Sequence, residues 1–275
     1  MNSVNTNVGA MLALQNLNRT NSDLATVQSR INTGLKVATA KDNGAIWAIA
    51  QGQRADVRAL GAVSSSLNRG VSAVDVALAA GETVSDLLLQ MKEKALAASD
   101  ASLTTSARSA LTEDFESLRD QITSVVTNAE FNGLNLLGAG ATGFEALANA
   151  QGTGSISVQA EVMALGGTIV TVGAAQTIST QTAATAAMTD VNDSIDNVSA
   201  ALARLGTTSK SLETHSNFVT KLTDTLEAGI GNLVDADLAK ESAKLQALQT
   251  KQQLGVQALG IANQAPQILM SLFSR

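Results

Sequence analysis

The sequence predicts a mainly α-helical protein, an elongated antiparallel helical bundle or coiled coil with a small β-hairpin-rich excursion in the middle of the chain. Only one proline, Pro266, occurs in 275 residues, so few positions interrupt a helix. A seven-residue apolar repeat runs through residues 191–233, and such repeats are typical of helices that wrap around one another. Between Phe131 and about Thr185 the helical period is lost and glycine is frequent, which favours turns and short strands.

The N-terminal segment predicts one amphipathic helix that ends near Gly34. Apolar residues recur along one face of it: Val4, Val8, Met11, Leu14, Leu17, Leu24, Val27 and Ile31. The run from Lys41 to Gly44 then predicts a turn, because Asp, Asn and Gly are the residues that turns favour.

Two further segments carry the alternating steps of three and four residues that a packed helix needs. The first holds Leu60, Leu67, Val71, Val74 and Leu78, slips in phase after Gly81, and continues with Val84, Leu88, Met91 and Ala95. The second holds Leu111, Phe115, Leu118, Ile122 and Val125. We expect both to pack in the bundle.

The middle of the chain contains two short runs of alternating polar and β-branched residues, Ser155–Val158 and Thr168–Val172. This pattern predicts β-hairpins within an excursion at about 131–185.

The heptad repeat then predicts a long helix over 190–235, on the order of 70 Å at 1.5 Å per residue. Its two apolar rows give the expected bundle core: Val191, Ile195, Val198, Leu202, Leu205, Leu212, Val219, Leu226 and Leu233. The second row becomes polar at Ser209, Ser216 and Thr223.

The C-terminal segment predicts a last helix with Leu238, Leu245, Leu248 and Leu259 on one face, which Pro266 should kink or end. We therefore expect two domains. Residues 1–38 and 236–275 form a terminal helical domain, and residues 39–235 form the bundle with its excursion.

Composition excludes several classes of function. The net charge is −6 and both ends are slightly basic while the middle is acidic, so nucleic acid is not an expected partner. The chain has no cysteine, which excludes disulfides and thiolate metal sites. No apolar run approaches the ~18 residues of a membrane span, and the N-terminus lacks a signal-peptide pattern. Charged residues are only 15% of the chain, which fits either an ordinary bundle or a subunit of a larger assembly.

No arrangement of residues predicts catalysis or a cofactor. His215 is the only histidine, so a histidine-based triad or a two-histidine zinc site cannot form. We expect His215 on the exposed side of its helix, and we expect no catalytic, cofactor-binding or metal-binding residues.

Short motifs at both ends resemble those of bacterial flagellin. One family motif, R-L-S-S-G-L-R-I-x-x-A-K-D-D, is similar to Arg30–Val37 followed by Ala40-Lys41-Asp42. A second, N-x-G-I-S, is similar to Asn68–Ser72. A third, F-N-G-x-x-L-L, is similar to Phe131-Asn132-Gly133 with Leu136-Leu137. Gln253-Leu254-Gly255 and Ala262–Gln267 resemble Q-x-G and A-N-x-x-P-Q. The resemblance covers about 1–138 and 186–275. Large outer domains are absent from this short form, and Ile46 and Asn43-Gly44 depart from the family pattern.

The resemblance implies a structural, non-enzymatic subunit that is exported by the flagellar type III apparatus without a cleaved signal. It implies an extracellular location in the filament, copies of the chain as partners in a helical homopolymer, and contact with an export chaperone and with hook–filament junction and cap proteins.

Assembly should use the apolar faces of both end helices, because neither has enough neighbours in one chain. The expected subunit-assembly residues are Leu14, Leu17, Leu24, Ile31, Leu238, Leu245, Leu248, Leu259, Pro266, Ile268, Leu269, Leu272 and Phe273. The alternative is that the two ends simply pair within one chain. Two other functions stay open, a hook–filament junction protein and a membrane-inserting type III translocator.

Overall fold

A computed structural model describes residues 6–273 of the chain, with side chains described for 6–264. Among these residues it contains five α-helices and two antiparallel pairs of short strands. The prediction of a mainly α-helical fold with a small β-rich middle is therefore confirmed. The chain divides into two compact units, Met1–Ala55 with Thr225–Arg275 and Asp56–Asp224.

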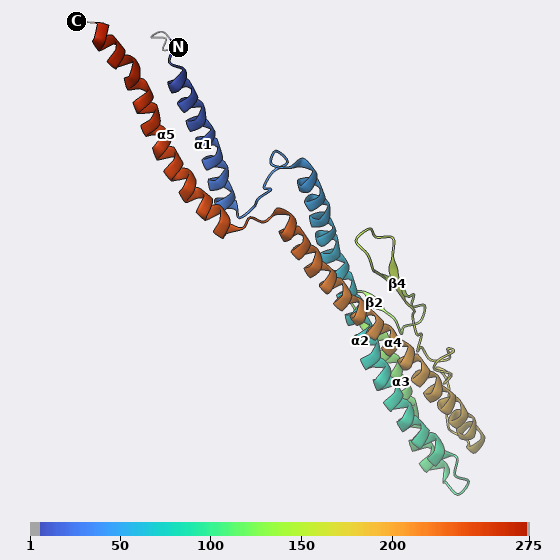
Figure 1. Ribbon diagram of the computed structural model, residues 1–275. Helices are drawn as coiled ribbons and strands as arrows, with labels where there is room; N and C mark the ends of the chain where they lie inside the picture. Colours follow the sequence, from blue (N-terminus) through green and yellow to red (C-terminus); the bar gives the residue numbers. More distant parts are fainter. Residues whose placement is uncertain (1–5, 274–275) are drawn as a thin grey trace. The chain divides into compact units, whose positions relative to one another are not determined.

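The first unit is built on α1 (Val8–Thr33) and α5 (Leu238–Phe273), which lie side by side in Figure 1. The Asn7 side chain caps the start of α1 by accepting a hydrogen bond from the Ala10 N–H at 3.0 Å. Gly34 ends α1 with a φ of 71°, in the left-handed region that favours glycine. The predicted end of the first helix near Gly34 is thus confirmed.

The segments that follow α1 and precede α5 pair with one another. Lys36 N–H donates to the Val234 carbonyl at 2.7 Å, and Ala236 N–H donates to the Gly34 carbonyl at 2.9 Å. Beyond them, the Asp42 carboxylate closes a turn by accepting hydrogen bonds from the Thr39 N–H and hydroxyl, which lower the pKa of Asp42.

The second unit contains most of α2 (Gly44–Ala98) and α4 (Gln181–Val234) and all of α3 (Thr105–Asn128). Helices α2 and α4 run antiparallel, because Gly81 faces Leu202 while Ser209 lies within 3.3 Å of Asp75 and Ser216 within 3.4 Å of Asn68. Ser209 and Ser216 of the second heptad row thus donate hydrogen bonds to α2, whereas Thr223 donates to the Val219 carbonyl of its own helix. Helix α3 returns along α2, and Lys94 Nζ lies 2.7 Å from Asp114 Oδ2.

The core of the second unit lies between these three helices. Its largest fully buried side chains include Leu67, Leu88, Met91, Phe115, Ile122, Leu205 and Leu212. The apolar stripes that the sequence shows in α2 and α3 supply most of them, and α2 continues without a break through the phase slip at Gly81.

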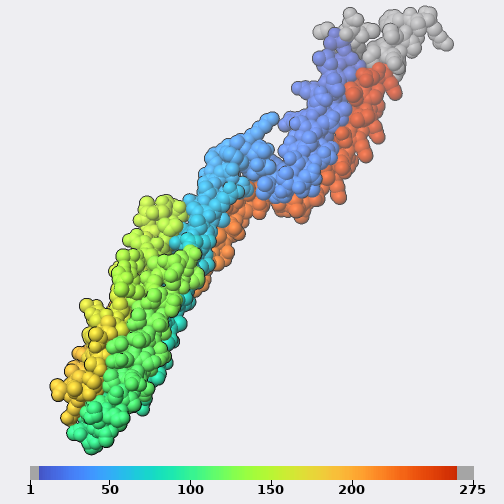
Figure 2. Space-filling view, turned by 180° about the vertical axis from the view of Figure 1, so that it is seen from behind, coloured from blue at the N-terminus to red at the C-terminus, as the bar shows by residue number. Residues whose placement is uncertain are grey.

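The β-rich middle lies along the helices of the second unit, where Figure 2 shows it in light green to yellow. Strands β1 (Glu130–Phe131) and β2 (Leu134–Asn135) form a minimal hairpin, and β3 (Phe144–Leu147) pairs with β4 (Ser155–Val158). The prediction of a hairpin strand at Ser155–Val158 is confirmed. The Phe144 ring packs on Gly70 of α2, where a Cβ atom would lie 3.2 Å from the ring.

The prediction of a strand at Thr168–Val172 is wrong, because this segment is an irregular loop. The Thr171 N–H donates to the Ser194 hydroxyl at 2.9 Å, and Gly166 N–H donates to the Val172 carbonyl at 2.8 Å. Ser194 of α4 is fully buried. A helix side chain and a local turn therefore satisfy backbone groups that a partner strand would otherwise bind.

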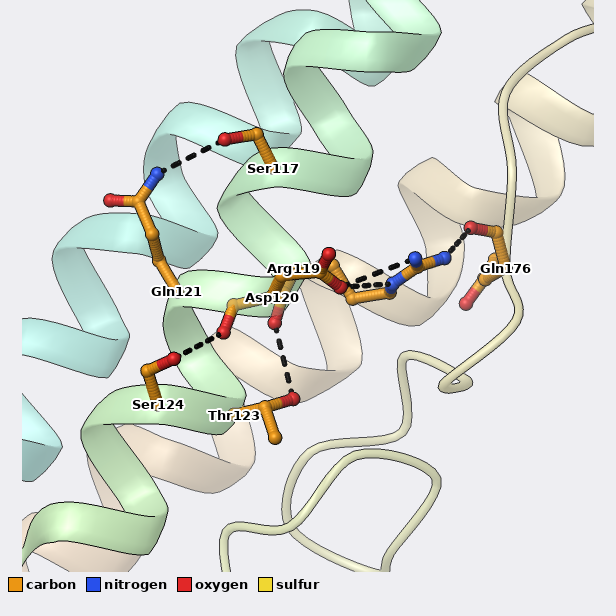
Figure 3. Close-up of polar contacts among 7 residues, drawn as sticks. All are labelled: Ser117, Arg119, Asp120, Gln121, Thr123, Ser124 and Gln176. Carbon is orange, nitrogen blue, oxygen red and sulfur yellow. Dashed lines mark hydrogen bonds and ion pairs between the residues drawn. The ribbon is translucent and has the colours of Figure 1, made fainter.

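A second polar contact holds this loop to α3, as Figure 3 shows. Arg119 donates from Nη1 to the Gln176 carbonyl at 3.0 Å, and its Nη2 lies 3.3 Å from Asp120 Oδ1. The irregular part of the excursion is thus fixed to two helices, which explains how it keeps one conformation without strands.

Helix α5 continues through Pro266 to Phe273, so of the two effects expected of this proline, a kink or an end of the helix, the end is wrong. A proline removes one backbone donor and crowds the preceding turn, and a long helix can carry one such defect.

We predict that Gly143→Ala destabilises the second unit by about 1–3 kcal/mol. A Cβ atom at position 143 would lie 2.2 Å from the Val158 carbonyl oxygen, so the β3–β4 pair must move apart. Urea unfolding followed by far-UV circular dichroism measures the change. Gly61→Ala is the matched control, because nothing lies within 4 Å of its Cβ position on α2, and it should stabilise the protein by roughly 0.5–1 kcal/mol. Equal effects of the two variants would contradict this account of Gly143.

Candidate assembly surface

The side chains that could carry chemistry are dispersed in the structure. No group of three or more His, Asp or Glu side chains capable of holding a metal occurs among the described residues. None of the helices in the described part of the chain is long and apolar enough to cross a membrane.

His215 has a structural contact instead, and its predicted exposed position is wrong. Its side chain is half-buried, and Nε2 lies 2.7 Å from the Ala148 carbonyl oxygen, just after β3. Its ring also lies against Phe218, with centroids 5.7 Å apart. His215 therefore attaches the β3–β4 hairpin to α4.

The main unpartnered feature is an apolar surface at one end of the α1–α5 pair. Its side chains range from 48% exposed at Leu14 to 71% at Ile261. The members are Val8, Met11, Leu12 and Leu14 of α1 and Leu254, Val256 and Ile261 of α5. These residues surround both helices, and a helix that is apolar on all sides is normally buried.

The same end of the pair has a groove between the two helices. It is lined by small residues together with the larger side chains of Leu12, Asn16, Leu17, Thr20, Lys251 and Leu254. The small residues are Gly9, Ala13, Gly255, Ala258 and Ala262. Small side chains let another helix approach closely, so this groove, which we call the α1–α5 groove, can accept an apolar helix face.

The opposite end of the pair differs. There α1 presents polar side chains to solvent, among them Asn21, Asp23 and Gln28, while Thr20, Val27 and Leu248 are buried between the helices. Seven of the eight exposed large apolar side chains described on α1 and α5 therefore lie at residues 8–14 and 254–261, and Leu238 is the eighth.

Three polar contacts connect α1 with α5. Asn7 Nδ2 donates to the Ala262 carbonyl at 2.7 Å, and Gln252 Nε2 donates to Asn21 Oδ1 at 2.7 Å. Arg30 Nη1 lies 3.3 Å from Glu241 Oε1. The two ends thus pair within one chain, as the alternative stated above expects, and this pairing leaves the α1–α5 groove uncovered.

The expected assembly residues occupy several environments in the first unit. Leu14 and Leu238 are exposed; Leu17, Leu24, Ile31, Leu245 and Leu259 are half-buried; and Leu248 is buried. The side chains of Pro266, Ile268, Leu269, Leu272 and Phe273 lie outside the described residues.

The expected bundle-core residues also differ in burial. Five of them are buried: Val191, Val198, Leu205, Leu212 and Val219. The other four are half-buried: Ile195, Leu202, Leu226 and Leu233.

Sequence reasoning about one apolar stripe per helix missed much of the exposed surface. Of the seven exposed members only Leu14 is among the expected assembly residues, and the small residues of the groove are absent from that set as well. The available signal was the presence of apolar residues on all sides of α1 over residues 8–14.

Comparisons with known proteins agree over nearly the whole chain. Residues 4–142 match the bacterial flagellin N-terminal helical region, and residues 188–273 match the bacterial flagellin C-terminal helical region. Flagellin FljK of Caulobacter vibrioides is 57% identical over 276 residues, covering 99% of both chains. A flagellin of Brucella melitensis is 36% identical over 282 residues, again covering 99% of both.

A solved structure shares the fold at low identity. A chain described as a flagellar hook-associated protein from Vibrio parahaemolyticus aligns with a TM-score of 0.58 at 15% identity, over 70% of this chain and 100% of that chain.

Proposed function

Because the chain belongs to the bacterial flagellin family, we propose that the α1–α5 groove and the apolar side chains around it are the surface through which its copies join. The chain is a structural subunit of the bacterial flagellar filament. The observation that carries the proposal is the concentration of exposed apolar side chains at residues 8–14 and 254–261.

The energetics favour joining over isolation. Covering one exposed Leu, Val, Ile or Met side chain contributes about 1.5–3 kcal/mol. Seven such side chains lie at residues 8–14 and 254–261 of the two helices, and they stay exposed in the described part of the single chain. Packing of further copies removes this surface from water, so polymerisation stabilises the paired helices α1 and α5.

The two compact units support different places in the filament for the two parts of the chain. We propose that residues 1–38 and 236–275 form the inner tube of the filament and that residues 39–235, with the excursion at 131–185, form the bundle around it. The second unit supports this assignment because it has a core of its own, with Phe115, Leu88 and Leu212 fully buried.

The remaining attributes follow from family membership and composition. We propose that the protein is non-enzymatic and needs no cofactor, that it is exported to the extracellular filament, and that it contacts an export chaperone and the junction and cap proteins on the way. The net charge of −6 supports the expectation that it binds neither nucleic acid nor an anionic membrane surface.

Electron microscopy of the purified chain tests the function directly. After addition of salt or short filament seeds, we expect long filaments whose number grows with protein concentration. A hook–filament junction protein would form no long filament alone, and a translocator would release dye from liposomes. Failure of the pure chain to polymerise with or without seeds would contradict the proposal.

A further inference from the structure

Two arginine–glutamate pairs link distant parts of the chain, and they differ in geometry. In the second unit, Arg204 Nε lies 2.7 Å from Glu161 Oε1, and Arg204 Nη2 lies 2.6 Å from Glu161 Oε2. This is the two-point contact that a planar guanidinium makes with a carboxylate.

The pair in the first unit makes only half of such a contact. Arg30 Nη1 lies 3.3 Å from Glu241 Oε1, near the upper end of hydrogen-bond distances. Arg30 Nε and Glu241 Oε2 are buried and have no hydrogen-bond partner, and Glu241 is only 9% exposed. A buried charged group with an unmet hydrogen bond destabilises the state that contains it.

The two unmatched atoms are complementary, since Nε–H is a donor and Oε2 an acceptor. A small shift of α1 relative to α5 would bring them together in the geometry that Arg204 and Glu161 already have. In the single chain this alignment is held elsewhere, by the hydrogen bonds from Asn7 to Ala262 and from Gln252 to Asn21.

We infer that Arg30 and Glu241 complete a two-point pair only in the filament, where neighbouring copies packed on α1 and α5 shift the two helices into a slightly different alignment. Both residues are then positioning residues for assembly, because the polymer satisfies polar atoms that the single chain leaves unmet. The inference rests on the proposed function, since it requires copies to pack on this unit.

Arg30→Lys is the most informative variant. Lysine keeps the positive charge and cannot make a planar two-point contact. We expect Arg30→Lys and Glu241→Gln each to raise the concentration of unassembled protein that coexists with filaments by about tenfold. Hydrogen-exchange protection of α1 in the unassembled chain should stay unchanged.

Glu161→Gln is the matched control. Its pair with Arg204 is already complete in the single chain, so this variant should lower the melting temperature of the unassembled chain, by roughly 5 °C. The hydrogen-exchange protection of α1 should not change in this variant either.

Two results would overturn the inference. If Arg30→Lys assembles like the wild type, charge attraction alone accounts for the role of Arg30, and the filament needs no two-point contact there. If Glu241→Gln removes the hydrogen-exchange protection of α1 in the unassembled chain, the Arg30–Glu241 pair already stabilises α1 before assembly. Failure of the proposed function is distinguishable, because then the wild-type chain itself forms no filaments in the same assay.

Discussion

A chain that lacks α1 and α5, cut to residues 34–237, is expected to stay folded and to form no filament. The deletion removes the α1–α5 groove and the seven exposed apolar side chains at residues 8–14 and 254–261. It leaves intact the core around Phe115, Leu88 and Leu212 in the second unit. Because assembly is proposed to depend on the deleted surface, the loss should be complete rather than graded.

Three measurements check this result. Far-UV circular dichroism should show a helical protein, urea should unfold it in one cooperative transition, and electron microscopy should show no filaments even with wild-type seeds. The full-length chain under the same conditions is the control. Fibres of normal width from the shortened chain would show that the bundle alone determines assembly.

The sequence predicted the helices well where the burying partner is another helix. The heptad positions Val191, Val198 and Leu212 are fully buried because their period matches the antiparallel packing of α4 on α2. Burial along the second heptad row follows residue size less closely. Before Ser209, the small residues Ser194 and Ala201 are buried while Ile195 and Leu202 are half-buried.

The reason lies in contacts that no local pattern contains. Ser194 is buried because its hydroxyl accepts hydrogen bonds from the loop at Thr171 and Val172, more than twenty residues away in sequence. The same contact makes the alternating run Thr168–Val172 a loop. Residue size and spacing cannot reveal a hydroxyl that satisfies distant backbone groups, so neither the burial of Ser194 nor the irregular loop could be predicted from the sequence.

The sequence predicted only part of the assembly surface, because an apolar stripe does not show which chain covers it. Stripes such as Leu14, Leu17 and Leu24 identify a buried face whether the covering helix belongs to the same chain or to another one. Only the structure separates Leu248, which is buried in the single chain, from Leu254 and Ile261, which are exposed in its described part. The Arg30–Glu241 contact likewise depends on geometry that the motif around Arg30 does not encode.

The second large effect is expected from a single charge placed in the α1–α5 groove. Leu254→Glu should leave the unassembled chain folded, because Leu254 is 60% exposed there. In the filament the new carboxylate would be removed from water, and Lys251, which lines the same groove, offsets only part of that cost, so the assembled state is destabilised by several kcal/mol. We therefore expect at least a 100-fold rise in the concentration of protein that remains unassembled, measured by sedimentation of filaments.

Gln253→Glu separates the effect of position from that of charge. It places the same carboxylate one residue earlier on α5, at an exposed position that does not line the groove. Its effect on the unassembled concentration should be at least ten times smaller than that of Leu254→Glu. If the two variants weaken assembly equally, added negative charge on α5 is responsible, and the groove is not the surface where copies meet. If only Leu254→Glu fails to assemble, copies must exclude water from the groove where they meet. A groove that stayed open to water would tolerate the carboxylate at position 254 as well as the one at position 253.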